Sequence, residues 1–279
     1  MSVERVSVDH SAEICGDGAM STGDRFRYLW QNACRNMASF GCGPATRPFY
    51  PDLHRARSAM SGQSPSRLVT ELFIESELPK LLPPRSMAVL EIGCGVGAMA
   101  RRLARLGYRG SYTGVDIQDR FRRDYPSGFP FEVDFRQIDA HEFSPNQQID
   151  FMISVSTLEH IPRDSELISR FPSFFNPGGL ELHVVPGGSS LLPYLWHGFR
   201  QYTPAALAAR FGLGIDIIRL GGLGSYLLHV IVITGPEMFF RRSLRNVMPG
   251  LYSRLLRAAL RLDRVFPIYP TAYAVIRRH

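Results

Sequence analysis

The chain has 279 residues, of which 45% are apolar and 20% charged, a balance typical of a folded protein and not of a long disordered chain. Its four cysteines lie far apart and form no C-x-x-C or Cys/His pattern with zinc spacing, so we expect neither a disulfide framework nor a metal site. No secretory signal is recognisable at the start, and no apolar stretch reaches the roughly 18 residues of a spanning helix. These features predict a cytoplasmic protein with reduced cysteines.

The net charge of +7 comes almost entirely from arginine, because Lys80 is the single lysine beside 31 arginines. A GC-rich coding genome would produce this bias, and so would selection for an acidic partner such as phosphate, nucleic acid or anionic lipid. Most of the arginines are scattered along the chain, which favours the first interpretation. The C-terminal segment, described below, is the exception.

Residues 1–85 are predicted to be helical and rich in loops. A helix capped by Thr22 or Asp24 should run to Phe40 and end at the glycines and proline that follow. Residues 66–82 form a second amphipathic pattern. Its apolar positions include Leu68, Leu72, Ile74 and Leu78.

From residue 86 to residue 236, short apolar runs alternate with helical stretches, a pattern typical of parallel strands joined by crossover helices. The first five runs are Met87–Ile92, Tyr112–Asp116, Phe131–Ile138, Ile149–Val155 and Leu180–Val185. Two more runs, Ile215–Leu220 and Tyr226–Thr234, are joined by G-G-L-G-S, which predicts a hairpin and a final antiparallel strand. The fold class is therefore α/β, with a doubly wound, mostly parallel sheet of seven strands.

The strongest motif is V-L-E-I-G-C-G-V-G-A at residues 89–98, an apolar strand that leads into a glycine turn and a helix. Glycine at positions 93, 95 and 97 lets the backbone turn sharply and lie close to a ligand, where a Cβ atom would collide. The stretch also matches the dinucleotide fingerprint G-x-G-x-x-A. On its own it does not separate a nicotinamide cofactor from S-adenosylmethionine.

Acidic residues end the next two strands. Asp116 lies 23 positions beyond Gly93, where a carboxylate can accept hydrogen bonds from both hydroxyls of a ribose; the alternative is a helix cap or a surface acid. Asp139 ends the third strand, where its carboxylate and the backbone amide of Ala140 can meet the edge of an adenine.

Two further motifs follow the fourth strand. Residues 154–162 read S-V-S-T-L-E-H-I-P, and residues 176–186 read N-P-G-G-L-E-L-H-V-V-P. In this order and at these intervals, the motifs of residues 87–190 resemble the class I S-adenosylmethionine-dependent methyltransferases. Within that class they are similar to the group with L-E-H after the fourth strand, such as the ubiquinone-biosynthesis methyltransferases. A nicotinamide enzyme would leave the L-E-H loop and the N-P-G-G turn unexplained.

The resemblance implies a Rossmann-like methyltransferase fold that binds S-adenosylmethionine. It implies that Glu91 and the glycines Gly93, Gly95 and Gly97 line the methionine side of the cofactor. Asp116 would hold the ribose, and Ile117 would flank the adenine.

The same resemblance assigns roles to residues on neighbouring strands. Asp139 and Ala140 would meet the adenine edge, while Ser154 and Val155 would lie near the sulfonium. Upstream, S-P-S-R-L is similar to the N-P-x-R-L segment of that group, whose arginine pairs with the cofactor carboxylate. This implies the same role for Arg67, although serine replaces the asparagine.

Methyl transfer is an in-line displacement, so much of the catalysis can come from positioning the acceptor. A hydroxyl acceptor also benefits from a general base, and histidine suits neutral pH. His160 is the first catalytic candidate, because its loop should lie at the carboxyl end of the sheet. Alternatively, Glu159 and His160 only hold the loop in shape. His183 is expected to be a satisfied core histidine, and the aromatic residues around His197 could line an acceptor pocket or serve packing.

Residues 237–279 are expected to form a basic amphipathic arm, with nine arginines and one acid after residue 240. Four of them share one helix face: Arg254, Arg257, Arg261 and Arg264. An apolar stripe lies beside them: Leu251, Leu255, Ala258, Leu262 and Val265. Such a helix can lie on an anionic membrane or cover a lipid-linked substrate. Alternatively, its apolar stripe packs on the core or on a second subunit, with the arginines in water.

The sequence therefore predicts an N-terminal helical lid (1–85), an S-adenosylmethionine-binding core (86–236) and the C-terminal arm (237–279). It favours methyl transfer to oxygen, ahead of nitrogen or carbon, of a small-molecule or lipid-linked metabolite. Nucleic acid is not expected as a partner, because no N-P-P-Y or D-P-P-Y type motif and no RNA-binding module is recognisable. Peripheral contact with the inner membrane face and homo-oligomerisation stay open.

Two other functions remain as alternatives. One is a membrane-associated binding or scaffolding protein that retains the fold without turnover. The other is transfer of a different group, such as aminopropyl from a decarboxylated cofactor, for which the carboxylate partner Arg67 would be unnecessary.

Overall fold

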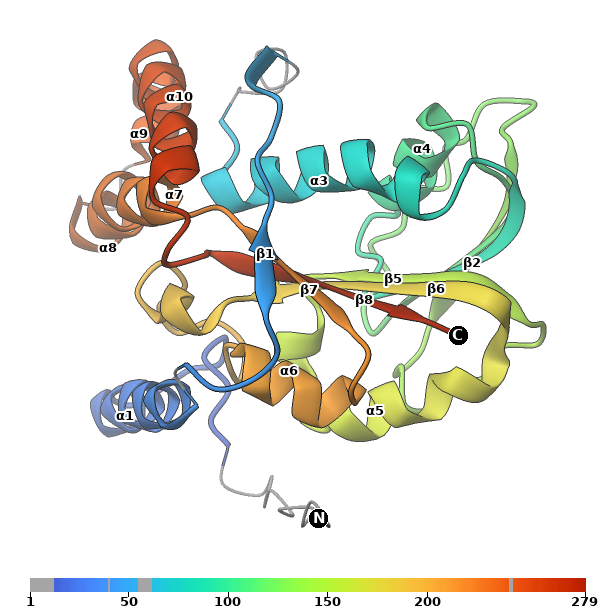
Figure 1. Ribbon diagram of the computed structural model, residues 1–279, viewed down its shortest axis with the longest axis horizontal. Coiled ribbons are helices and arrows are strands. Elements are labelled where there is room, and N and C mark those ends of the chain that lie inside the picture. The colour runs from blue at the N-terminus through green and yellow to red at the C-terminus, as the bar shows by residue number, and fades with distance from the viewer. Residues whose placement is uncertain (1–12, 40, 55–61, 241–242) are drawn as a thin grey trace.

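The protein is described by a computed structural model that covers residues 13–39, 41–54, 62–240 and 243–279. Phe40, Arg241 and Arg242, which the sequence places in helical segments, lie outside the described residues. One sheet runs through the centre of the molecule (Figure 1). Its strands are β1 (Thr46–Pro48), β2 (Ser86–Ile92), β3 (Arg109–Asp116), β4 (Phe131–Gln137), β5 (Ile149–Val155), β6 (Phe175–Pro186), β7 (Asp216–Leu220) and β8 (Ala272–Arg278).

The strands lie in the order β1-β7-β8-β6-β5-β2-β3-β4, and only β8 runs antiparallel to its neighbours. The six runs predicted as strands between residues 87 and 220 are all strands in the structure. The described sheet has eight strands, not seven, because β1 adds a parallel edge strand to β7. An antiparallel last strand is present, as the sequence predicts, but β8 forms it instead of residues 226–234.

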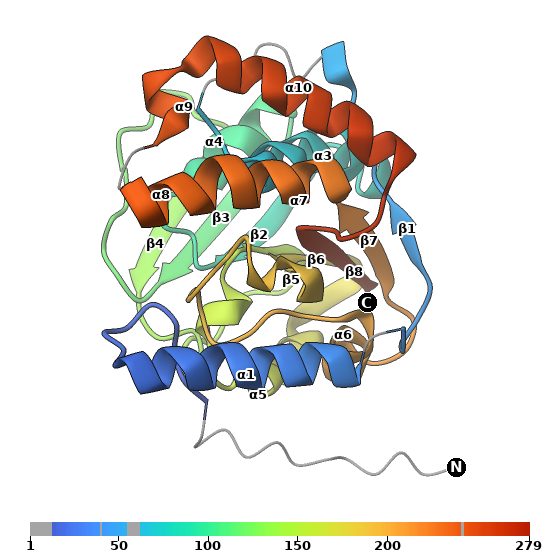
Figure 2. The same cartoon turned by 90° about the vertical axis from the view of Figure 1, so that its left-hand side faces the viewer.

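Helices cover both faces of the sheet (Figures 1 and 2). One layer contains α3 (Pro65–Leu81), α4 (Ala98–Arg105), α7 (Leu223–Leu228), the π-helix η5 (His229–Thr234), α8 (Gly235–Phe240), α9 (Leu244–Val247) and α10 (Pro249–Val265). The other contains α1 (Thr22–Ala38), α5 (Asp164–Arg170) and α6 (Pro204–Phe211). Short 3₁₀ turns occur at η2 (Leu158–His160), η3 (Phe171–Phe174) and η4 (Gly188–Leu191). Among the described residues, no helix is long and apolar enough to cross a membrane.

Hydroxyl side chains cap three of the helices, as expected where the first N–H groups lack partners. Ser21, not Thr22 or Asp24, caps α1 by accepting a hydrogen bond from the amide of Asp24. Ser64 caps α3 in the same way. Thr203 caps α6, as the sequence predicts.

Each face of the sheet has its own apolar core. On the α3 side, the predicted apolar positions of α3 are all buried, together with Tyr252 and Leu256 of α10. On the α5 side, Ile92, Leu158 and Leu207 belong to a second buried cluster. The sheet is thus buried on both faces, as a mostly parallel sheet requires, and its carboxyl edge is left for ligands.

The prediction of a strand at residues 226–234 is wrong, because this run is helical. Gly221, with a φ of 74°, ends β7 in a turn, and α7 starts two residues later. A Cβ atom on Gly224 would lie 2.2 Å from the carbonyl oxygen of Ala259, so α7 and α10 pack backbone to backbone at this point. Tertiary packing therefore overrides the strand preference of the β-branched run. The helices α7–α10 form one long connection between β7 and β8, which we call the helical insertion.

The C-terminal segment is correspondingly not a separate arm along its whole length. Residues 249–265 do form a helix, but β8 lies between β6 and β7 in the middle of the sheet. The expected domain boundaries, and the lid role of residues 1–85, remain predictions.

The described N-terminal residues are tied to the loop before α6. Glu13 forms ion pairs with Arg35 and with the buried Arg200. The amide of Gly16 donates to the carbonyl of Gly198 over 2.7 Å, and the hydroxyl of Tyr28 donates to the carbonyl of residue 197 over 2.8 Å. These contacts carry the N-terminal segment to the carboxyl edge of the sheet.

Candidate active site

The glycine turn after β2 begins the site. Gly93, Gly95 and Gly97 have φ values of 71°, 55° and 76°, which L-residues with a side chain rarely adopt. A Cβ atom on Gly93 would lie 2.2 Å from the side chain of Thr157, and one on Gly97 would lie 2.3 Å from the ring of Phe135. A Cβ atom on Gly95 would meet no described atom within 4 Å, so its outer side is open for a ligand.

Asp116 ties the end of β3 to this turn. Its Oδ2 atom accepts a hydrogen bond from the amide of Gly95 over 2.8 Å, and its Oδ1 atom accepts one from the amide of Gln118 over 2.9 Å. The carboxylate therefore lies beside the glycine turn, as the sequence analysis predicts from their spacing. Ile117, the next residue, is 67% exposed at the same edge.

Two cavities meet at this edge. The Glu91 cavity has a volume of about 440 Å³, and the Asp116 cavity has a volume of about 600 Å³. Both are lined by Gly93, Gly95 and Ser156, so they adjoin at the glycine turn.

Most of the predicted cofactor residues line these two cavities. Arg67, Glu91 and Val155 line the Glu91 cavity. Asp116, Ile117, Asp139 and Ala140, with His160, line the Asp116 cavity. Gly97 and Ser154 are not among the lining residues, and Ser154 is fully buried. Its hydroxyl is 2.6 Å from Nδ1 of His183, whose Nε2 is 2.7 Å from Glu181, so His183 is the satisfied core histidine that the sequence predicts.

Glu91 is a buried acid with a single hydrogen-bond donor, the hydroxyl of Tyr112, among its described partners. Burial raises the pKa of Glu91 to about 8; the charge of Asp116 adds to the rise, and the hydrogen bond from Tyr112 opposes it. Such a carboxyl is a ready partner for a cation that enters the cavity.

Two arginines also line the Glu91 cavity. Arg67 is exposed at the rim, with Nε 3.6 Å from Oε1 of Glu71, and Nη2 of Arg102 is 2.9 Å from the same oxygen. Burial works to raise the pKa of Glu71, but the hydrogen bond and charge of Arg102 outweigh it and lower this pKa. The sequence analysis misses Arg102, which lines the cavity one helical turn beyond Ala98.

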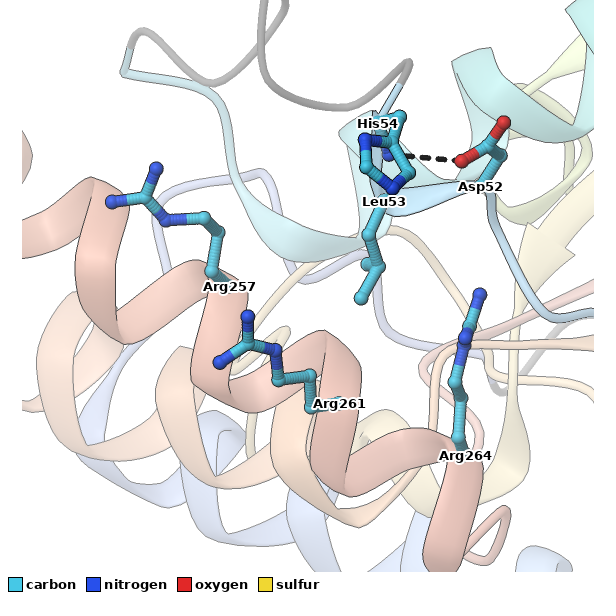
Figure 3. A pocket seen from close by; sticks show the side chains of 6 residues that line it. All are labelled: Asp52, Leu53, His54, Arg257, Arg261 and Arg264. Carbon is cyan, nitrogen blue, oxygen red and sulfur yellow. Dashed lines mark hydrogen bonds between the residues drawn. The ribbon is translucent and has the colours of Figure 1, made fainter.

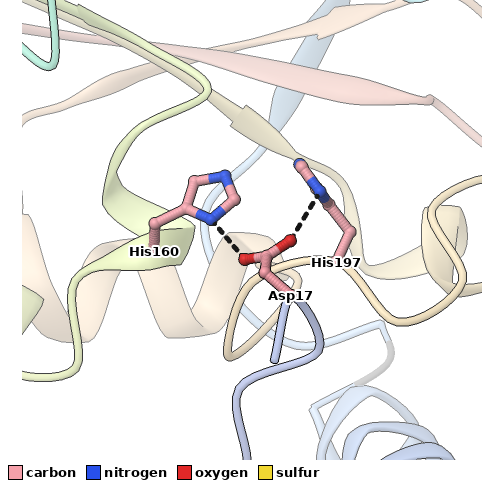
Figure 4. A group of neighbouring side chains, drawn as sticks. All are labelled: Asp17, His160 and His197. Carbon is pink, nitrogen blue, oxygen red and sulfur yellow. Dashed lines mark hydrogen bonds and ion pairs between the residues drawn. The ribbon is translucent and has the colours of Figure 1, made fainter. Parts of the chain in front are cut away.

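The side chains of Asp17, His160 and His197 lie next to one another, as Figure 4 shows. Nδ1 of His160 is 2.7 Å from Oδ2 of Asp17, and Nδ1 of His197 is 3.3 Å from Oδ1 of the same residue. Burial works to raise the pKa of Asp17, but the charge and hydrogen bond of His160 outweigh it and lower this pKa. Sequence reasoning misses Asp17, because 143 positions separate it from His160.

The buried side chain of Glu159 lies close to both histidine rings. It is 1% exposed, and its Oε1 atom is 3.9 Å from Nε2 of His160 and 3.8 Å from Nε2 of His197. Its Oε2 atom has no hydrogen-bond partner among the described residues, and burial raises the pKa of this carboxyl to about 8. Burial also lowers the pKa of His197, and the charge of His160 lowers it further.

The two histidines face different cavities. His160, the predicted catalytic residue, lines the Asp116 cavity, whereas His197 lines the Glu91 cavity together with Tyr194. Nitrogen and oxygen atoms of Asp17, His160 and His197 lie within 4.8 Å of one another, a grouping that could hold a divalent cation. The sequence analysis expects no metal here.

A model of the methyltransferase domain family matches residues 66–224, which is more than half of the chain, and the chain therefore belongs to this family. S-adenosylmethionine is the cofactor of this class. Its positively charged amino group and its carboxylate fit the acid and the arginines of the Glu91 cavity, and its nucleoside fits the Asp116 cavity.

Curated relatives and a solved structure agree with this family. A ubiquinone biosynthesis O-methyltransferase of Paramagnetospirillum magneticum is 28% identical over 101 residues, which are 35% of this chain and 40% of that one. A trans-aconitate 2-methyltransferase of Streptomyces coelicolor is 29% identical over 151 residues, 52% of this chain and 47% of that one. The chain thus spans about half or less of the length of these relatives. An S-adenosylmethionine-dependent methyltransferase from Archaeoglobus fulgidus shares the fold with a TM-score of 0.50 and 19% identity, over 82% of this chain and 100% of that one.

Proposed function

We propose that this chain transfers the methyl group of S-adenosylmethionine to a hydroxyl oxygen of a small-molecule or lipid-linked metabolite. The junction of the two cavities at the glycine turn is the observation that carries this proposal. S-adenosylmethionine supplies a methyl group on a positively charged sulfur, which lies between an amino acid and a nucleoside. The Glu91 cavity suits the amino acid, and the Asp116 cavity suits the nucleoside.

Side chains of opposite charge would hold the amino acid half. The buried Glu91 accepts hydrogen bonds from the ammonium group, and this contact offsets the cost of burying its own charge. Arg67 and Arg102, which line the same cavity, bind the carboxylate. Val155 and Ser156, at the end of β5, lie at the junction near the sulfur.

The nucleoside half would bind along the next two strand ends. Asp116 accepts hydrogen bonds from the ribose hydroxyls, since it already faces the glycine turn. Ile117 packs on the adenine, and Asp139 with the amide of Ala140 meets its polar edge. This assignment follows the sequence prediction for all four residues.

The acceptor would occupy the rest of the Glu91 cavity, beside His197 and Tyr194. We propose that the Nδ1–H group of His197 donates a hydrogen bond to Asp17, which leaves the Nε2 lone pair free to take the proton of an acceptor hydroxyl. The lowered pKa of His197 keeps its imidazole neutral near pH 7, as a base requires. Asp17 then acts as the orienting carboxylate, and His160, the predicted catalytic residue, holds Asp17 in place.

The cofactor half of the proposal is tested by calorimetric titration with S-adenosylmethionine. We expect Asp116→Ala to weaken binding about 100-fold, because hydrogen bonds to a charged group contribute about 1.5–3 kcal/mol each. Asp124→Ala is the matched control, because Asp124 forms a surface ion pair with Arg101. Equal affinity in the wild type and Asp116→Ala would contradict the assignment of the Asp116 cavity.

The catalytic half is tested by transfer of a labelled methyl group to a panel of phenols, catechols and hydroxyquinols with and without a polyprenyl tail. We expect His197→Ala to lower the rate about 10²–10⁴-fold with little change in cofactor affinity. His160→Ala should be less damaging, and the exposed His54→Ala should match the wild type. Full activity of His197→Ala on an accepted substrate would refute its role as base. Tight cofactor binding without turnover on any lipid or small molecule would instead favour the scaffold alternative.

A lipid-linked acceptor would also require peripheral contact with the inner membrane face. The sequence suggests the C-terminal segment for this contact, and we include it in the proposal.

A further inference from the structure

The helical insertion presents an unusual outer surface. It lies along one side of the molecule, with α10 beside α7 and α8 (Figures 1 and 2). Its inner side is well anchored, because Tyr252, Leu256 and Leu260 are buried in the core. Asp263 accepts hydrogen bonds from the amide and the hydroxyl of Ser225, which fixes α10 to α7.

The apolar stripe that the sequence assigns to α10 faces away from this core. Leu251 is 46% exposed, Leu255 is 38% exposed and Val265 is 68% exposed. Exposed apolar residues continue at both ends of the helix, and we call the whole set the outer stripe: Val247, Met248, Leu251, Leu255, Val265, Phe266, Ile268 and Tyr269. A group of exposed apolar side chains along one helix and its flanks is typical of an interaction surface.

The four arginines of α10 flank the stripe. Three of them line a pocket of about 180 Å³ beside the loop at residues 52–54 (Figure 3). Arg264 donates to the carbonyl of Pro51 over 2.8 Å, whereas Arg254, Arg257 and Arg261 form no ion pair with any described residue.

Little negative charge balances this surface. Residues 243–279 contain seven arginines and one acid, which is the buried Asp263. Asp52 borders the same pocket, where its carboxylate accepts a hydrogen bond from the amide of His54. The four arginines of α10, which we call the arginine row, therefore outnumber the acid beside them, and this surface keeps a net positive charge.

We propose that the outer stripe and the arginine row form a docking face for the surface of an anionic phospholipid bilayer. The stripe enters the boundary between headgroups and acyl chains, and the arginines reach the phosphates beside it. A bilayer satisfies both halves of the face at once. A second copy would not, because a symmetric contact through this face would bring arginine rows close to each other.

The proposal is independent of the methyl acceptor, so the test uses vesicles and needs no substrate. The full chain is sedimented with sucrose-loaded vesicles of equal parts phosphatidylglycerol and phosphatidylcholine, or of phosphatidylcholine alone. We expect partitioning on to the anionic vesicles only. Arg254→Gln with Arg261→Gln should lower the partition coefficient about 30-fold, given the usual contribution of each arginine near an anionic surface.

The apolar half is tested by Leu251→Gln with Val265→Gln, which should lower the coefficient about 10-fold or more. Matched controls change residues outside the face and should bind as the wild type does. For charge, the control is Arg105→Gln with Arg109→Gln, at exposed sites by α4 and β3. For apolar surface, it is Leu213→Gln with Met37→Gln, at sites 95% and 66% exposed.

Three results would overturn the proposal: no binding of the wild type to anionic vesicles, equal losses in the face and control variants, or loss in the arginine variant alone. Sedimentation equilibrium adds a fourth, namely a concentration-dependent dimer that disappears in Leu251→Gln with Val265→Gln. Unchanged S-adenosylmethionine affinity in each variant shows that the fold is intact. Vesicle binding and S-adenosylmethionine binding are measured separately, so a failure of membrane docking can be distinguished from a failure of the proposed function.

Discussion

Replacing Glu91 by glutamine removes a carboxyl that is buried and forms no direct ion pair with a described residue. Burial raises its pKa to about 8, compared with about 4.3 in an unfolded chain. The folded state therefore binds this proton more tightly than the unfolded state does. Below the unfolded pKa the carboxyl is neutral in both states and costs little, and its cost grows as the pH rises towards 8.

The size of the effect follows from the two pKa values. Within this window one pH unit corresponds to about 1.4 kcal/mol, and the curvature at both ends leaves about 3 kcal/mol between pH 5 and pH 8. Urea unfolding of the wild type and Glu91→Gln at pH 5, 6.5 and 8 measures it. The free energy of unfolding of the variant, relative to the wild type, should rise by about 3 kcal/mol across this range.

Two controls sharpen this test. The exposed Glu132→Gln should follow the wild type at every pH. Glu159 has a pKa raised in the same direction, so some pH dependence should persist in Glu91→Gln. Parallel stability curves for the wild type and Glu91→Gln would refute the reasoning, because they would mean that the carboxyl titrates alike in both states.

Other predictions concern the frame of the site and are measured by urea unfolding. Gly97→Ala should lower the free energy of unfolding by more than about 2 kcal/mol, because the new side chain meets both a positive φ and a steric clash. The control Gly128→Ala has the same φ but open space, and should cost about 1 kcal/mol. Equal costs for the two variants would argue against the clash. Arg200→Met should cost about 2–3 kcal/mol, because Glu13 and Asp164 lose a fully buried cation and keep only their pairs with Arg35 and Arg210; a near-neutral result would mean that these two arginines suffice. Gly224→Ala should lower stability by at least about 1 kcal/mol by pushing α7 away from Ala259, and a neutral result would contradict the close packing of these helices.

The sheet and the glycine turn beside Asp116 could be predicted from the sequence because their signals are local. A buried strand ending at Ile92, a glycine turn and an acid at the end of the next strand all lie within about 30 residues, the span of one βαβ unit. The φ values of the turn and the hydrogen bond from Gly95 to Asp116 agree with that pattern. Arg102 was within reach of the same reasoning, since it follows the turn on α4.

Residues 226–234 could not be assigned correctly, because their β-branched composition favours a strand locally. What decides their conformation is Gly224, whose missing side chain admits α10 at close range. The partner residue, Ala259, comes 35 positions later. No window on the sequence shows that contact, and the same limit explains why β8 is assigned to the arm.

The acid that holds the two histidines was hidden for a similar reason. Asp17 reaches His160 and His197 only because Glu13 and Gly16 attach the N-terminal segment to the loop at residues 197–200. The motif L-E-H marks one of the two histidines and gives no sign of the other. The catalytic candidate therefore shifts from His160 to His197 only when the cavities that each one lines are known.

The features that were predicted and those that were missed belong to two different parts of the proposed site. The proposed cofactor edge is built from consecutive strand ends. The proposed acceptor wall is assembled from distant segments, and the ring of Tyr194 lies 5.7 Å from that of His197 and 5.1 Å from that of His229 in η5. The hydroxyl of Thr234 also donates to the carbonyl of Pro193, so the helical insertion supports this wall from behind. The insertion that carries the outer stripe is thus in contact with the residues that would meet the acceptor. If the proposed docking holds, contact with a bilayer therefore bears directly on the proposed acceptor wall.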